Sequence, residues 1–190
     1  MIFEAVIITR NADGSPHMVP MGYRESGEDV VLAPFRPSTT LDNLVRSRQA
    51  VINLTDNVAI IAGCLTGHFE WPTQPAAVVE AARLTDTLAH LEVEVRHEEP
   101  DEQRPRFLCA VRHRQQHRSF RGFNRAQAAV VEAAILVSRL HLLPAEKVDR
   151  EIAYLRTAVD KTAGLSERQA WGWLMARIAM HREPTAREAR

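Results

Sequence analysis

The segment LAPFRPSTTLDNL, from Leu32 to Leu44, joins an apolar stretch typical of a strand to a pattern typical of a helix. The residues from Asp29 to Phe35 predict a strand. Apolar residues then recur at spacings of three and four, which predicts a short helix from Thr40 to Arg48. Three consecutive hydroxyl residues, Ser38 to Thr40, stand where this helix begins. A strand is therefore expected to pass directly into a helix N-terminus.

Such a helix N-terminus attracts anions, because its first N–H groups lack partners and the helix dipole places positive charge there. Arg36 adds a guanidinium group that suits bidentate contact with phosphate. A purely structural explanation stays open. Ser38 or Thr39 would then be the N-cap, with Asp42 closing a capping box and Arg36 on the surface.

The first third of the chain predicts further strands. Residues Ile2–Thr9 are rich in Ile, Val and Phe, and the sequence NADGSP that follows is typical of a turn. His17–Glu25 is a second candidate strand, in which Pro20 and Gly22 indicate an edge, a bulge or a close approach of the backbone to another group. Ala50–Asp56 is a further strand.

The rest of the chain divides into a hairpin and helices. HLEVEVRHEE and RFLCAVRHRQQHR predict two paired strands, with Glu92 and Glu94 facing Arg112 and Arg114 across the pair. Three helices follow Gly122, and the tail HREPTAREAR looks frayed. The segment VAIIAGCLTG fits either a buried helix or a strand, and Phe69–Pro75 looks like a loop. We expect a mainly β domain with some α over residues 1–120 and a helical subdomain over residues 121–190.

Composition excludes several classes of protein. The net charge is +0 and the pI about 7.1, which disfavours nucleic acid and anionic membranes as partners. Only two cysteines occur, Cys64 and Cys109, and neither a signal peptide nor a long apolar run is recognisable. A cytoplasmic protein without a membrane segment is expected.

Four blocks of sequence carry a resemblance to a known family: IITRNADGSPHMVPMG, VVLAPFRPSTTLDNL, AVINLTD and FNRAQAAVVEAAILVSRLHLLP. In this order they resemble the domain-of-unknown-function family 447. That family belongs to the FMN-binding split-barrel proteins, together with flavin reductases and pyridoxamine phosphate oxidases. The resemblance implies a six-stranded split β-barrel that forms a homodimer, with FMN in a groove at the subunit interface.

The resemblance also implies which residues contact FMN. Arg36, Ser38, Thr39 and Thr40 would hold the phosphate, with Asn43 in support. The isoalloxazine ring would lie against the backbone of the second strand, where the missing side chain of Gly22 permits close approach. The further residues expected at the ring are Pro20, Met21, Thr9 and Arg10.

Two more candidates each have a structural alternative. Asn53 lies in an otherwise apolar strand, so it is either an amide donor to the ring edge or a buried amide satisfied within the protein. Arg125 could reach a flavin across the interface, whereas its neighbour Asn124 could simply cap a helix.

The implied activity is redox chemistry through flavin N5, with NADH, NADPH or a pterin as donor. An FMN-dependent oxidoreductase or flavin reductase is the first hypothesis, and a non-catalytic FMN-binding carrier, sensor or electron-transfer module is the alternative. A helix-turn-helix regulator is a weaker third. No residue is an obvious proton donor, although His17 and His68 are candidates.

Two other sequence patterns could suggest a metal site and a nucleic-acid surface, but each is better explained by the secondary structure. Cys109, His113 and His117 would form a metal site on a helix, but on a strand the two histidines would lie about 13 Å apart, so no metal is expected. Seven arginines from Arg104 to Arg125 are offset by an acidic facing arm, which indicates a solvated hairpin rather than a nucleic-acid surface.

Overall fold

The computed structural model of this chain describes residues 1–183. The expectation of a frayed tail falls, from residue 184 onward, outside the described residues. The chain forms two compact units. Residues 1–56 and 70–120 form a barrel unit, whereas residues 57–69 join the chain from residue 121 onward in a helical unit. The second unit therefore includes an internal segment that the expected division at residue 120 assigned to the β domain.

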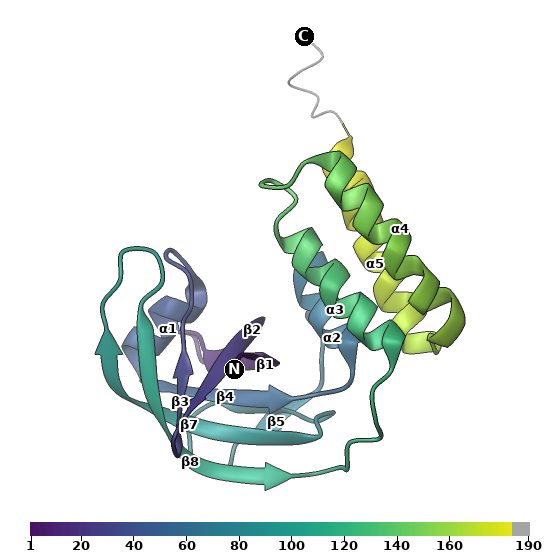
Figure 1. The fold of residues 1–190 in the computed structure, drawn as a ribbon. Coiled ribbons are helices and arrows are strands. Elements are labelled where there is room, and N and C mark those ends of the chain that lie inside the picture. Colours follow the sequence, from purple (N-terminus) through teal and green to yellow (C-terminus); the bar gives the residue numbers. More distant parts are fainter. Residues whose placement is uncertain (184–190) are drawn as a thin grey trace. The chain divides into compact units, whose positions relative to one another are not determined.

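Six antiparallel strands close the barrel, as predicted (Figure 1). Neighbouring strands follow the order β1 (Phe3–Arg10), β2 (Pro16–Ser26), β3 (Asp29–Leu32), β8 (Arg106–Gln116), β7 (Ala89–Glu99) and β4 (Gln49–Leu54). Because side chains alternate along a strand, every second residue points into the barrel. The core is filled by such residues, among them Ile7, Tyr23, Leu32, Ile52 and Phe107.

The hairpin of β7 and β8 forms as expected, but it is less solvated than its charges suggest. Arg112 and Glu94 make the predicted cross-strand ion pair at 2.7 Å. Glu92, in contrast, is completely buried, and it bonds to backbone rather than to an arginine. From His90 to Val93, strand β7 is covered on both faces.

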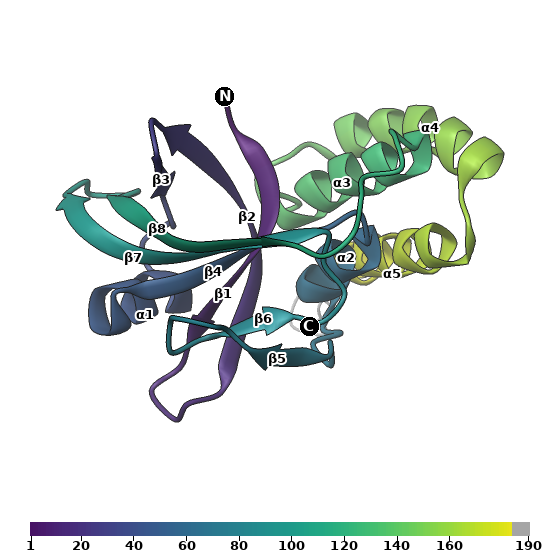
Figure 2. The same cartoon turned by 90° about the horizontal axis from the view of Figure 1, so that it is seen from below.

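Two smaller elements complete the barrel unit. Helix α1 (Thr39–Ser47) contacts β1, β2 and β4, and its buried residues include Leu41 and Leu44. The short strands β5 (Thr73–Pro75) and β6 (Ala82–Leu84) pair with each other beside the barrel, as Figure 2 shows. The end of the expected loop at Phe69–Pro75 is thus a strand.

The helical unit contains α2 (Val58–Thr66), α3 (Arg125–Ser138), α4 (Ala145–Thr162) and α5 (Leu165–Arg182). Of the two alternatives for VAIIAGCLTG, the helix is observed. Helix α2 is apolar nearly all round because it packs against both α3 and α5. The helices α4 and α5, whose helix–turn–helix order suggested a regulator, pack within the same unit through their apolar faces.

Across residues 1–183, no helix combines the length and apolar character that crossing a bilayer would require.

Candidate functional site

Helix α1 begins with free donor groups. Ser38 is the N-cap: its Oγ accepts a hydrogen bond from Leu41 N at 3.2 Å, and its carbonyl accepts one from Asp42 N. Within the described part of the chain, the N–H groups of Thr39 and Thr40 have no acceptor. Thr39 is exposed, and the Ser38 hydroxyl can still donate while it accepts. The capping role and an anion-binding role are therefore compatible.

Arg36 lies just before this helix, with an exposed side chain. Its backbone N–H donates to the Gln103 carbonyl at 2.8 Å, which fixes the segment against the loop after β7. Its guanidinium has no hydrogen-bond or ion-pair partner in residues 1–183. An exposed cation that precedes unpaired N–H groups and hydroxyls by a few residues in the chain is a donor set suited to a phosphate ester.

The third hydroxyl of the segment points inward. Thr40 is 3 % exposed, and its Oγ1 lies 3.0 Å from His17 Nε2 on strand β2. Burial lowers the pKa of His17 below its ordinary value of 6.5, which favours the neutral imidazole. Thr40 and His17 thus connect the helix to β2, with Thr40 buried and His17 partly buried.

Strand β2 has an unpaired edge next to this helix. Its pairing with β3 is confined to Tyr23–Ser26, although its pairing with β1 extends from Pro16 to Tyr23. In the part of the chain that is described, alternate residues among 16–22 therefore have backbone groups without a strand partner on the β3 side. Unpaired strand edges offer N–H and C=O groups to any ligand that lies along them. Pro20, Met21 and Gly22 are on this edge.

Met21 and Gly22 differ in what lies next to them. Met21 packs against the barrel core. A Cβ atom on Gly22 would come within 2.6 Å of Ile2 Cγ2, so the close approach at this glycine is that of Ile2. Backbone groups on this edge are therefore available to a ligand that lies along it.

A buried polar network lies beneath α1. Asn43 Nδ2 donates to Thr9 Oγ1 at 3.0 Å and to Asn11 Oδ1 at 2.9 Å. Asn43 Oδ1 accepts from Arg46 at 2.9 Å, and Arg46 also donates to the Arg10 carbonyl. Asn43 thus fixes α1 on the end of β1. The sequence indicated Asn43 and Thr9 but missed Asn11 and Arg46, although Arg46 follows Asn43 at helical spacing.

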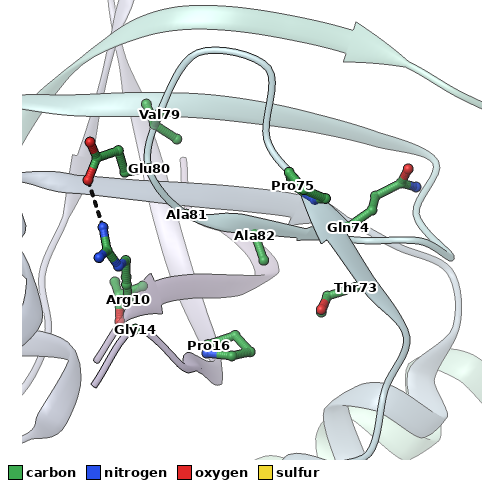
Figure 3. A pocket seen from close by; sticks show the side chains of 11 residues that line it. Arg10, Gly14, Pro16, Thr73, Gln74, Pro75, Val79, Glu80, Ala81 and Ala82 are labelled. Atoms are coloured by element: carbon green, nitrogen blue, oxygen red, sulfur yellow. Dashed lines mark hydrogen bonds and ion pairs between the residues drawn. The ribbon is translucent and has the colours of Figure 1, made fainter. Parts of the chain in front are cut away.

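A pocket of about 420 Å³ opens on another side of Thr9 and Arg10 (Figure 3). The strands β5 and β6 and the loop between them supply most of its lining. The Arg10 guanidinium lies 2.6 Å from the Glu80 carboxylate across the pocket. Arg36 and Ser38 do not line it. Glu80 therefore compensates the charge of Arg10 in this pocket, whereas Arg36 before α1 has no such partner among residues 1–183.

A family model described as "Protein of unknown function (DUF447) N-terminal domain" matches residues 3–118, and a second DUF447 model matches residues 124–176. The chain belongs to the DUF447 family. No curated protein matches it in sequence.

Solved structures share the fold of this DUF447 protein. The FMN-bound protein MM1853 from Methanosarcina mazei, also of DUF447, superposes with a TM-score of 0.80 at 18% identity, over 93% of this chain and 94% of that one. Two further structures superpose with a TM-score of 0.54. The 2-nitrobenzoate 2-nitroreductase NbaA of Pseudomonas fluorescens is 18% identical, over 60% of this chain and 64% of its own. The flavoredoxin of Methanosarcina acetivorans is 9% identical, over 61% of this chain and 69% of its own. At these identities the likeness establishes the split-barrel fold.

The remaining predicted residues lie elsewhere in the DUF447 protein. Asn53 is fully buried: its Nδ2 donates to the Val6 carbonyl at 3.1 Å, and its Oδ1 accepts from Leu84 N at 2.8 Å. Both ends of the amide are engaged, which favours the second of its two alternatives. Arg125 is exposed in the first turn of α3, where Asn124 caps the helix. His68, in the helical unit, stacks on Trp173 with ring centroids 4.0 Å apart.

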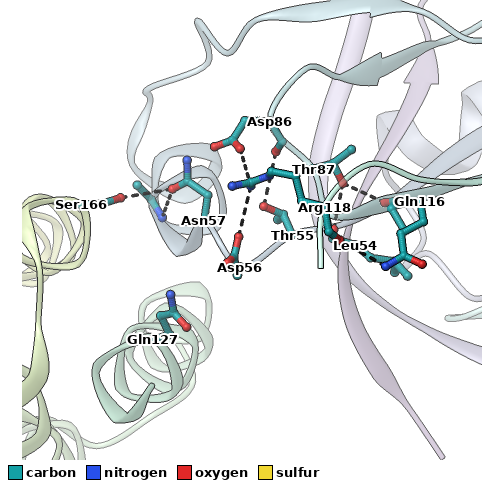
Figure 4. A network of polar contacts seen from close by, with 12 residues as sticks. Leu54, Thr55, Asp56, Asn57, Asp86, Thr87, Gln116, Arg118, Gln127 and Ser166 are labelled. Atoms are coloured by element: carbon teal, nitrogen blue, oxygen red, sulfur yellow. Dashed lines mark hydrogen bonds and ion pairs between the residues drawn. The ribbon is translucent and has the colours of Figure 1, made fainter. Parts of the chain in front are cut away.

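A separate ionic network ties strand ends together within the barrel unit (Figure 4). Arg118 contacts Asp86 at 2.6 Å and Asp56 at 3.4 Å. Thr87 donates to carbonyl oxygens of Leu54 and Ala89. The acidic partners compensate Arg118, so this network is structural.

Proposed function

We propose that this DUF447 protein binds FMN, with the phosphate at the N-terminus of α1 and the ring along the free edge of β2. The uncompensated Arg36 guanidinium beside the unpaired N–H groups of Thr39 and Thr40 carries this proposal. Free backbone groups at Pro20–Gly22 offer donors and acceptors to the polar edge of a flavin. The FMN-bound state of the family member MM1853 supports the assignment.

When bound, FMN would supply hydride or electron transfer, and the protein would supply position and electrostatics. The roles of the chain's own residues follow from their contacts. Arg36, Ser38, Thr39 and the N–H of Thr40 bind the phosphate. Asn43 and Thr9 hold α1 in place behind the site. We further propose that the protein works as a homodimer and that NADH, NADPH or a pterin reduces its flavin.

One observation favours the alternative, an FMN-binding module without turnover. His17 is a titratable residue on β2, and its Nε2 lies within hydrogen-bond distance of Thr40 Oγ1. Its lowered pKa keeps it neutral. A neutral, engaged imidazole is a poor general acid. Turnover that depends on proton transfer from this residue is therefore disfavoured, and FMN binding without turnover is the second candidate function.

The phosphate site is tested by titrating FMN into the Arg36→Ala/Thr39→Ala double variant and following flavin fluorescence. Removal of a guanidinium and a hydroxyl should weaken binding by roughly 100-fold or more, because each of the two bonds to a charged group contributes about 1.5–3 kcal/mol. The matched control is Arg156→Ala/Thr157→Ala, which removes the same two residue types from the exposed face of α4. Wild-type affinity in the double variant would refute the phosphate position.

The two functions are separated by anaerobic addition of NADH, NADPH or a reduced pterin to the flavin-loaded protein. An oxidoreductase should bleach the flavin absorbance at a rate that saturates with donor concentration. A binding module should show no bleaching faster than free FMN under the same conditions.

A further inference from the structure

Four polar side chains lie close together at the outer face of the β7–β8 hairpin: those of His90, Glu92, His113 and His117. Glu92 on β7 pairs directly with His113 on β8, and His90 pairs with Gln115. Leu91 and Val93 point into the core, so His90 and Glu92 point to the opposite face. Both are nevertheless buried, at 1 % and 0 % exposure. They lie beneath the loop between β5 and β6.

Glu92 is held as a fixed carboxylate. One oxygen accepts from Ala77 N at 2.6 Å, and the other accepts from Val78 N at 2.6 Å and Val79 N at 3.0 Å. These N–H groups satisfy both oxygens of the carboxylate, and hydrogen bonds of this kind favour its charged form. The buried group therefore carries a negative charge.

His90 is oriented on both sides of its ring. Its Nε2 lies 3.1 Å from Glu92 Oε1, and its Nδ1 lies 2.9 Å from His117 Nε2. The rings of His90 and His117 are nearly parallel, with centroids 5.0 Å apart. A metal-bound histidine commonly has such a partner on its second nitrogen.

His113 is the residue of this cluster whose buried position is not explained by hydrogen bonds within the protein. Its Nε2 is buried and has no hydrogen-bond partner in the described structure. Its ring centroid lies 5.7 Å from that of His90. An unpaired buried imidazole nitrogen is destabilising, so such an atom next to a buried carboxylate calls for a ligand.

We propose that His90, Glu92 and His113 bind one divalent transition-metal ion of the zinc or iron type. One ligand atom from each residue lies within 4.8 Å of the other two. Two ligands of a tetrahedral zinc ion are roughly 3.4 Å apart, each about 2.1 Å from the metal. The 3.1 Å between His90 Nε2 and Glu92 Oε1 already fits this geometry, and a small rotation of the partly buried His113 brings in the third ligand.

The ligand set itself indicates the chemistry of the ion. Two imidazoles and one carboxylate bind zinc and non-haem iron and leave at least one position open. A hydrogen-bonded chain from His117 through His90 to Glu92 would satisfy those three residues without a metal, but it leaves His113 unpaired. The unpaired nitrogen of His113 therefore favours the metal site over the hydrogen-bonded chain alone.

This site differs from the metal motif that the sequence offered. Cys109 belongs to the barrel core and is not a ligand. His117 lies behind His90, as a positioning residue. The expectation of no metal was based on the spacing of His113 and His117 along one strand, whereas the ligands proposed here come from two strands.

The test is zinc binding by the purified full-length protein, measured by competition with a chromophoric chelator and by metal content after desalting. We expect one zinc per chain, no comparable retention of Mg²⁺, and an X-ray absorption spectrum of nitrogen and oxygen ligands without sulfur. Cys64 is a poor competitor, because burial raises the pKa of its thiol to about 11.

Variants make the assignment specific. His113→Phe keeps a ring but removes both nitrogens, and it should lower zinc affinity by at least roughly 10- to 100-fold. Glu92→Gln should do the same, with circular dichroism as the check on folding. The matched control is His97→Ala, an exposed histidine on the same strand, which should bind zinc as the wild type does. Arg36→Ala/Thr39→Ala should also keep its zinc, which separates this site from the flavin site.

Sub-stoichiometric zinc in the wild type, sulfur ligands in the spectrum, or wild-type affinity in His113→Phe would each overturn the proposal. If Glu92→Gln fails to fold, His113→Phe decides alone, because His113 makes no hydrogen bond through Nε2 that its loss could break.

Discussion

Asn43 organises the polar interior under α1. A single amide connects Thr9 and Asn11 at the end of β1 with Arg46 one turn further along the helix. Because Asn43 is only 4 % exposed, water cannot replace these bonds when the side chain is removed. The position of the helix N-terminus, and so of the proposed phosphate site, depends on this residue.

The Asn43→Ala variant should lose about 2–4 kcal/mol of unfolding free energy, because it leaves buried partners without hydrogen bonds. The measurement is urea denaturation. Asp42→Ala, on the exposed face of the same helix, is the control and should cost no more than about 0.5 kcal/mol. Equal losses in both variants would show that the network contributes nothing specific.

His17 gives the barrel a defined dependence on pH. Burial lowers its pKa in the folded protein below the ordinary value of 6.5, so the unfolded chain binds more protons as the solution becomes acidic. The stability from this residue is complete above pH 6.5 and is lost as the pH falls through the folded pKa.

The loss of stability between about pH 7.5 and about pH 5 should therefore be smaller in His17→Gln, which can still bond to Thr40 but does not titrate. Denaturation midpoints of both proteins at the two pH values provide the test. Identical losses would mean that His17 has the same pKa in the folded and unfolded states.

At the scale of elements, the side chain of Asn53 hydrogen-bonds β6 to the barrel. Asn53 on β4 accepts from Leu84 N and donates to the Val6 carbonyl on β1. The pair β5–β6 forms a separate two-stranded sheet, and an isolated pair of short strands is marginally stable at best. The loop between these strands covers Glu92 and lines the pocket beside Arg10.

Asn53→Ala should loosen this sheet more than the barrel. We expect faster amide hydrogen exchange in residues 73–84 and a global loss of about 1–3 kcal/mol, since Leu84 N loses its buried acceptor. Gln74→Ala, on β5 itself, is the control. Unchanged exchange in Asn53→Ala would show that backbone pairing alone holds β6 in place.

At the scale of the whole molecule, the homodimer expected from the family resemblance stays a prediction. Exposed apolar side chains within the barrel unit are compatible with it: Phe35 is 61 % exposed, Val78 59 % and Val45 51 %.

Sedimentation equilibrium of the FMN-loaded protein should give a mass close to twice the 21.4 kDa of one chain. A dilution series in the presence and absence of FMN would show whether the flavin strengthens association, as a site shared between subunits requires. A monomer at every concentration would contradict a flavin site at a subunit interface.

Much of the fold follows from local patterns. Alternation predicted the barrel strands and the β7–β8 hairpin, and spacings of three and four predicted α1 and the C-terminal helices. The hydroxyl run and Arg36 indicated an anion site at a helix N-terminus, and the structure shows free donors there. Asn53 was left with two alternatives, because a polar residue in an apolar strand does not reveal its partners.

The sequence by itself determined which segments become strands and helices, because periodicity reports which face of an element is buried. Only the tertiary structure decided which segments meet: β4 beside both β1 and β7, α2 within the helical unit, and Glu92 beneath residues 77–79. The proposed metal site is of this second kind. His90, Glu92 and His113 come together through the register of two strands and a covering loop, and the pairing of distant segments depends on contacts that no local pattern records.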